Sequence, residues 1–129
     1  MKLINSLYKV VSKNVVGSSL RYDILLDASH FIYQAHFPEE PVTPGVCIIQ
    51  IAKELLEDHL SRGLHIRTIK NVKFLNVISP VESPRISYAF EKITTDDAAK
   101  TCQVQVLVLA DEKAMAKLSF TCVFNNDRT

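Results

Sequence analysis

Apolar and polar residues alternate along two stretches near the end of the chain, and this period of two predicts half-buried β-strands. The first stretch, 100–110, places four apolar side chains on one face: Cys102, Val104, Val106 and Val108. The second stretch, 113–125, repeats the pattern with Ala116, Leu118, Phe120, Cys122 and Phe124. Only Asp111 and Glu112 separate the two, so we expect an antiparallel hairpin.

Four other segments are rich in β-branched and aromatic residues and also predict strands: 7–16, 20–27, 65–75 and 85–93. The first two flank a turn sequence, Gly17-Ser18-Ser19, and therefore predict another hairpin. The following stretch, 28–43, contains two prolines and predicts an irregular segment.

One long helix is predicted to begin at Pro44, because proline favours the first helical position and Thr43 before it is a good N-cap. Residues 46–52 are apolar apart from Gln50, which predicts a helix that is buried on every face. We expect the helix to end near Gly63. Its second half is expected to expose Lys53, Glu54, Glu57, Asp58 and Arg62.

This order of elements predicts an α+β fold, an antiparallel sheet of about six strands wrapped around one long central helix. The chain has 129 residues, a length that predicts one domain spanning 1–129. A small sheet over a single apolar helix leaves its rim open. We therefore expect a homodimer or a larger assembly, such as a trimer of dimers.

Composition narrows the function classes. Fifteen basic and fourteen acidic residues give a net charge of +1, which argues against nucleic-acid binding. No stretch approaches the ~20 apolar residues of a membrane span, and the first residues do not resemble a signal peptide. The three cysteines, without a CxxC pair, predict buried thiols in a reducing compartment rather than a metal site. We expect a cytoplasmic protein with no metal and no cofactor.

One motif is specific. His36-Phe37-Pro38 is followed by Pro41 and then by Pro44-Gly45-Val46 at the start of the predicted helix. This segment resembles the signature of the hotdog-fold β-hydroxyacyl-[acyl-carrier-protein] dehydratases of fatty-acid synthesis. Asn71-Val72-Lys73-Phe74-Leu75 through Pro80 is similar to a further strand of that family. The order of the elements also fits, so the resemblance covers nearly the whole chain.

The resemblance implies a lyase of lipid metabolism that removes water from a 3-hydroxyacyl thioester to give a trans-2-enoyl thioester. His36 would take the proton beside the thioester carbonyl, a role that suits the ordinary pKa of histidine. Gly45 lies in the first turn of the predicted helix, where backbone N–H groups can polarise a carbonyl. Phe37, Pro44 and Val46 are expected to line the acyl pocket beside it, at the subunit boundary.

The chain departs from the family at the second catalytic position, where the family has a glutamate or aspartate and this chain has Gln50. An amide donates hydrogen bonds but transfers no proton at neutral pH. We expect His36 of one chain to face Gln50 of the other. Glu54, one turn further, is a candidate substitute acid acting through water, and Glu39 and Glu40 replace the glycine of the motif.

Two functions follow from the resemblance. The first is a dehydratase, weak because of Gln50, acting on substrates bound to acyl carrier protein or to coenzyme A. The alternative is a non-catalytic hotdog subunit that binds acyl chains or carrier protein, or that pairs with an active paralogue in a heteromer. A hotdog thioesterase is a third, less favoured candidate. Arg67, Lys70 and Lys73 are predicted contacts for an acidic carrier protein.

Overall fold

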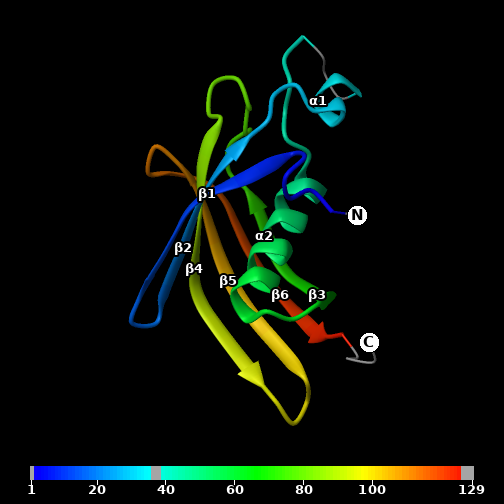
Figure 1. The fold of residues 1–129 in the computed structure, drawn as a ribbon, viewed down its shortest axis with the longest axis vertical. Helices are drawn as coiled ribbons and strands as arrows, with labels where there is room; N and C mark the ends of the chain where they lie inside the picture. Colours follow the sequence, from blue (N-terminus) through cyan, green and yellow to red (C-terminus); the bar gives the residue numbers. More distant parts are fainter. Residues whose placement is uncertain (1, 36–38, 126–129) are drawn as a thin grey trace.

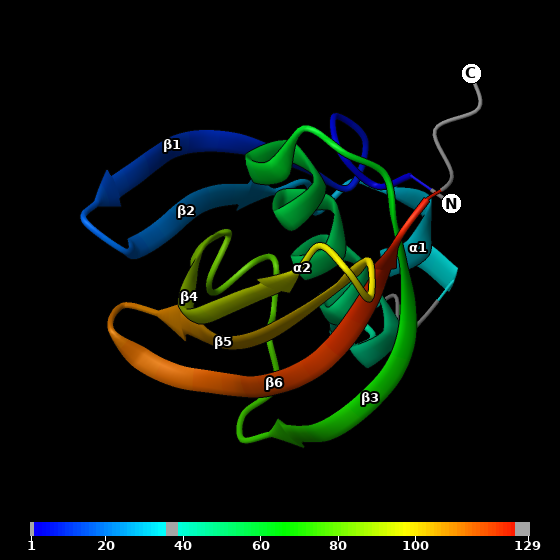
Figure 2. The same ribbon diagram turned by 90° about the horizontal axis from the view of Figure 1, so that it is seen from below.

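A computed structural model describes residues 2–35 and 39–125. A six-stranded antiparallel sheet curves around one long helix, α2, as Figures 1 and 2 show from two directions. The strands lie in the order β1-β2-β4-β5-β6-β3, so β1 and β3 form the two edges. The predicted architecture is confirmed. The bounds of the strands are β1 Tyr8–Val16, β2 Ser19–Leu26, β3 Leu64–Phe74, β4 Arg85–Asp96, β5 Thr101–Ala110 and β6 Lys113–Phe124.

The inner face of the sheet is apolar in the register that the sequence predicts. Cys102 pairs directly with Cys122 across β5 and β6, and Val106 pairs with Leu118. All four side chains are buried, as expected for the inward set of an alternating strand. The two strands meet in a turn at Asp111 and Glu112, both of which adopt positive φ. The predicted hairpin is therefore confirmed.

Helix α2 spans Gly45–Leu60 and buries one face against the concave side of the sheet. Its buried residues recur at helical spacing: Cys47, Ile48, Ile51, Ala52, Glu54, Leu55 and Leu56. The expectation that the first half is buried on every face is wrong for the single chain, because Val46 is 66% exposed. Glu54, expected outside, is buried instead.

Both ends of α2 differ from the prediction in detail. Pro44 is the N-cap and offers no side-chain hydrogen bond, while the hydroxyl of Thr43 is taken by Tyr33 at 2.9 Å. At the other end Ser61, with left-handed backbone, terminates the helix two residues before Gly63. Gly63 serves a different purpose, since a Cβ there would lie 2.5 Å from the side-chain nitrogen of Asn125.

The segment predicted to be irregular contains a short helix, α1, at Phe31–Ala35. Its Tyr33 is fully buried, and the hydroxyl bond to Thr43 ties α1 to the segment that enters α2. Thr43 is in turn fixed to Ile78 by a backbone hydrogen bond of 2.8 Å. Described residues thus anchor the chain on both sides of residues 36–38.

Candidate functional site

The start of α2 carries most of the described residues that the motif singles out. Pro44, Gly45 and Val46 form the N-cap and first turn, and Gln50 follows one and a half turns later. At 1.5 Å per residue, Gln50 lies about 7–8 Å from Gly45 along the helix axis. His36 and Phe37, the other predicted site residues of the motif, lie outside the described residues.

An aromatic ring lies against the start of this helix. A Cβ at Gly45 would be 2.7 Å from the Cζ atom of Phe74, so only glycine fits beneath the ring in this arrangement. Phe74, at the end of β3, is itself 51% exposed. The sequence indicated only that Gly45 leaves room for a ligand, and it gave no sign that Phe74 uses part of that room.

An apolar pocket of about 280 Å³ adjoins this contact. Val42, Ile48 and Ile78 line it together with Gly45 and Phe74. Leu75 and Val77 also line the pocket and are exposed, as is Val46 in the first turn of α2. An exposed apolar patch of this kind is typical of a binding site or a subunit interface.

Gln50 forms a hydrogen bond that the sequence did not indicate. Its Nε2 atom donates to Oε2 of Glu54 at 2.8 Å. Glu54 also accepts from the backbone N–H groups of Leu3 and Ile4, each at 2.8 Å, and from the hydroxyl of Tyr8 at 2.9 Å. Burial and the neighbouring Glu54 carboxylate hold the pKa of Tyr8 well above its usual range.

This arrangement bears on the suggestion that Glu54 replaces the missing acid. The side chain is 6% exposed and accepts from four donors. A carboxylate so occupied acts as an acceptor, and it anchors the first residues of the chain to α2. The structure therefore assigns Glu54 to that anchor rather than to proton donation.

The three predicted carrier-protein contacts lie on the edge strand β3 and are all exposed. Arg67 and Lys70 are the extra residues of two bulges, so they break the simple alternation of the strand. Lys73 pairs directly with Lys117 of β6, and Lys70 shares a small hollow with Lys92 of β4. Lys92 and Lys117 were missed because strand pairing is not visible in the sequence.

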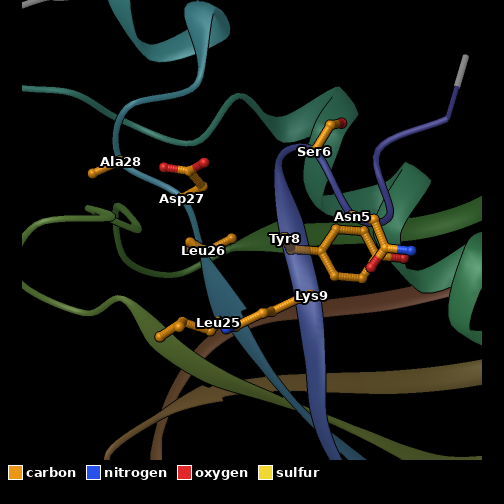
Figure 3. A pocket seen from close by; sticks show the side chains of 8 residues that line it. All are labelled: Asn5, Ser6, Tyr8, Lys9, Leu25, Leu26, Asp27 and Ala28. Carbon is orange, nitrogen blue, oxygen red and sulfur yellow. The ribbon is translucent and has the colours of Figure 1, made fainter.

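A separate hollow of about 380 Å³ lies between the beginning of β1 and the end of β2 (Figure 3). Tyr8, Lys9 and Asp27 are among its lining residues, and none of the predicted site residues is. The Asp27 carboxylate accepts from the hydroxyl and the N–H of Ser29, which lower its pKa. Asp27 therefore already has local partners.

Two features that would imply other functions are missing from the described part of the chain. Residues 2–35 and 39–125 contain no group of three or more metal-ligating side chains, and none of their helices is long and apolar enough to cross a membrane.

The three cysteines are buried and unpaired, as predicted. Burial raises the pKa of all three thiols, which makes them weak nucleophiles.

Comparisons with solved structures support the fold. The chain is similar to the structure titled "The Dehydratase Heterocomplex ApeI:P" from Xenorhabdus doucetiae, with a TM-score of 0.63 and 17% identity, covering 88% of this chain and 96% of that one. A structure described as a putative thioesterase from Lactococcus lactis has a TM-score of 0.62 and 11% identity, covering 89% and 91%. These likenesses confirm the predicted hotdog fold.

Sequence comparison is more specific. The 3-hydroxyacyl-[acyl-carrier-protein] dehydratase FabZ of Ligilactobacillus salivarius is 28% identical over an alignment of 92 residues, and the match covers 58% of this chain and 66% of the relative. The match thus spans just under two thirds of that relative. A family model described as "ApeI-like: ApeI dehydratase" matches residues 12–117, most of the chain and every strand except parts of the first and last. The chain therefore belongs to the ApeI-like dehydratase family.

Proposed function

We propose that the chain acts on 3-hydroxyacyl thioesters of fatty-acid or polyketide-type synthesis and removes water to give the trans-2-enoyl thioester. The proposal rests on the family membership of the chain. It is supported by helix α2, which begins at Gly45, nine residues after His36 in the sequence. Acyl carrier protein is the proposed carrier, and coenzyme A is the other candidate.

In the proposed reaction His36 takes a proton from the carbon beside the thioester carbonyl. The backbone N–H of Gly45, at the positive end of the helix dipole, would stabilise the charge that develops on the carbonyl oxygen. The bond between the β-carbon and its hydroxyl then breaks, and the hydroxyl needs a proton to leave as water. Gln50 cannot supply that proton.

The lack of an acid at Gln50 predicts a slow enzyme. General acid–base assistance is worth roughly 10²–10⁴-fold in rate. Glu54 offers no substitute, because its oxygens hold the N-terminal residues and Tyr8. The proton for the leaving hydroxyl would then come from the protonated His36 or from water.

The second candidate is a binding subunit that pairs with an active hotdog chain. Gln50 favours it, and so does the likeness to a structure whose title names a dehydratase heterocomplex. The free edge of β3 and the exposed side chains of Val46 and Phe74 offer a surface for that partner or for a second copy of this chain. The partner would bring its own carboxylate to the shared site.

An activity assay separates the two. The protein is incubated with 3-hydroxyacyl thioesters on carrier protein, and formation of the conjugated enoyl product is followed by absorbance. We expect weak activity that His36→Ala abolishes. Weak activity that survives His36→Ala would reject this site, and no activity in any variant would favour the binding subunit.

Gln50→Glu sharpens the assay. The new carboxyl would lie within hydrogen-bond reach of Oε2 of Glu54, where Nε2 now lies at 2.8 Å. Two carboxyls this close share a proton, and the pKa of the pair rises. The variant therefore places a protonated acid at the site near neutral pH, and we expect a gain of about 10²-fold or more. No gain would mean that the missing acid is not what limits the rate.

The carrier-protein contact has its own test. Lys73 and Lys117 lie directly opposite each other, and like charges in that position cost stability unless an anion compensates them. We expect Lys73→Glu and Lys117→Glu to weaken binding of acyl carrier protein, most strongly at low salt. Lys100→Glu is the matched control, because Lys100 lies in the exposed turn between β4 and β5, beside the start of β3 and not beside the Lys73–Lys117 pair near its end. Equal losses in all three would reject this surface.

A further inference from the structure

The buried carboxylate of Glu54 gathers its four hydrogen bonds from three separate parts of the chain. Two come from the backbone of Leu3 and Ile4, one from Tyr8 at the start of β1, and one from Gln50 on α2 itself. All four donors are neutral groups. The carboxylate thus joins the N-terminal residues to the helix position where the family has its catalytic acid.

The bond to Gln50 fixes which end of its amide faces Glu54. A carboxylate that already receives N–H and O–H donors can only accept, so the amide must present its nitrogen to Oε2. Because the amide is planar, its oxygen Oε1 lies on the side of the amide that faces away from Glu54. A carbonyl oxygen has two lone pairs, so Oε1 can accept from a ligand as well as from protein.

We propose that Glu54 is a positioning residue, which holds the amide of Gln50 so that its carbonyl oxygen accepts a hydrogen bond from the 3-hydroxyl group of the acyl ligand. This inference rests on the proposed function and adds the basis of ligand selection. The site prefers 3-hydroxyacyl thioesters over saturated ones, because only the 3-hydroxyl group adds this hydrogen bond to the complex.

The preference is measured as a ratio of dissociation constants for a 3-hydroxyacyl thioester and the saturated thioester of equal length. One neutral hydrogen bond predicts a ratio of about 3- to 10-fold in the wild-type protein. Gln50→Leu, which removes the acceptor, brings the ratio to about one.

Glu54→Gln tests the positioning itself. Its amide nitrogen can donate to Oε1 of Gln50, which releases or reverses the Gln50 amide, so the ratio again falls towards one. Tyr8→Phe is the matched control. It removes one of the other donors to Glu54 and leaves the Gln50 bond intact, so the wild-type ratio is retained.

A second measurement does not depend on ligand. In the NMR spectrum of the free protein, the side-chain amide protons of Gln50 exchange slowly with solvent while Glu54 holds them. Slow exchange is kept in Tyr8→Phe and lost in Glu54→Gln, with circular dichroism confirming that both variants fold. Fast exchange in the folded wild-type protein would overturn the positioning role.

The outcomes separate this inference from the proposed function. Wild-type protein that binds no thioester rejects the proposed function and the ligand part of the inference, while amide exchange still decides the role of Glu54. Wild-type protein that binds both thioesters equally well overturns the selection of the hydroxyl alone. A ratio that falls in Gln50→Leu but persists in Glu54→Gln overturns the positioning role alone.

Discussion

Two carboxylates of this molecule, Glu54 and Asp23, accept several hydrogen bonds in contrasting surroundings. Glu54 is buried and receives neutral donors from the N-terminal residues, β1 and α2. Asp23, on the outer face of β2, receives the hydroxyls of Ser12 at 2.9 Å and Ser87 at 2.5 Å. The guanidinium of Arg21 also lies 3.5 Å from Asp23.

The difference shows how the same side-chain chemistry acts in two ways. At the outer face, water can replace a lost partner and nearby cations share the charge, so each contact contributes little. Around Glu54 the bonds from Leu3 and Tyr8 are buried, so these two donors are left unsatisfied when the carboxylate is removed. We therefore expect Glu54 to control stability and local order, and Asp23 to control how stability responds to pH.

The largest effect is expected from removing each carboxylate. Glu54→Leu leaves four donors without their acceptor and should lower the free energy of unfolding by about 3 kcal/mol or more, because each buried orphan costs roughly 1–3 kcal/mol. Asp23→Ala should cost about 1 kcal/mol. Urea denaturation of the two variants measures both losses, and equal losses would break the comparison.

Single donors give a smaller contrast. Tyr8→Phe removes a buried hydroxyl that donates to Glu54, and we expect a loss of about 1–2 kcal/mol in unfolding free energy. Ser12→Ala removes a partly exposed donor to Asp23 and should cost less than about 1 kcal/mol. The same denaturation experiment applies, and a larger loss for Ser12→Ala would reverse the expected order.

The third prediction concerns how the stability contributed by Asp23 changes with pH. The hydroxyl of Ser87, helped by Ser12 and Arg21, lowers the pKa of Asp23 in the folded protein below its unfolded value near ~3.9. A lowered folded pKa contributes stability above the unfolded value, and that contribution disappears as the pH falls through the folded value. The stability difference between wild type and Asp23→Asn should therefore shrink below pH ~4, as followed by thermal unfolding. A constant difference would contradict it.

The smallest effect belongs to the exposed pair of Arg21 and Glu112 at the β5–β6 turn, whose atoms approach to 2.6 Å. The hydrogen bond from Arg21 lowers the pKa of Glu112. Glu112→Gln should reduce the melting temperature slightly at low salt. Near 1 M salt, where the screening length is about 3 Å, the reduction should vanish. A reduction that persists in salt would show that the pair acts through more than charge.

The strands and the helix could be predicted because the residues that each element buries recur along the sequence at the spacing of a strand or of a helix. Glu54 shows where this reasoning stops. Its helical position predicts an exposed side chain, and only the return of residues 3–8 over α2 buries it. That contact joins residues about fifty positions apart, so the sequence around Glu54 alone does not predict it.

The helix that carries the predicted site residues Gly45 and Gln50 could be predicted from the motif, and the side chains packed against it could not. Gly45 and Gln50 do lie on one helix, as expected. The ring of Phe74 over Gly45 depends on where β3 ends relative to α2, which the spacing of residues does not show. His36 remains a prediction, because it lies outside the described residues.

The bulges of the two edge strands have a consequence for how the protein behaves at high concentration. Val11 is the extra residue in β1, and Arg67 and Lys70 are the extra residues in β3. An edge with such interruptions does not present an even row of N–H and C=O groups, and two of the three interruptions carry a positive charge. Open-ended strand addition into fibrils is therefore disfavoured at both edges, while a partner whose own edge fits the bulges can still bind.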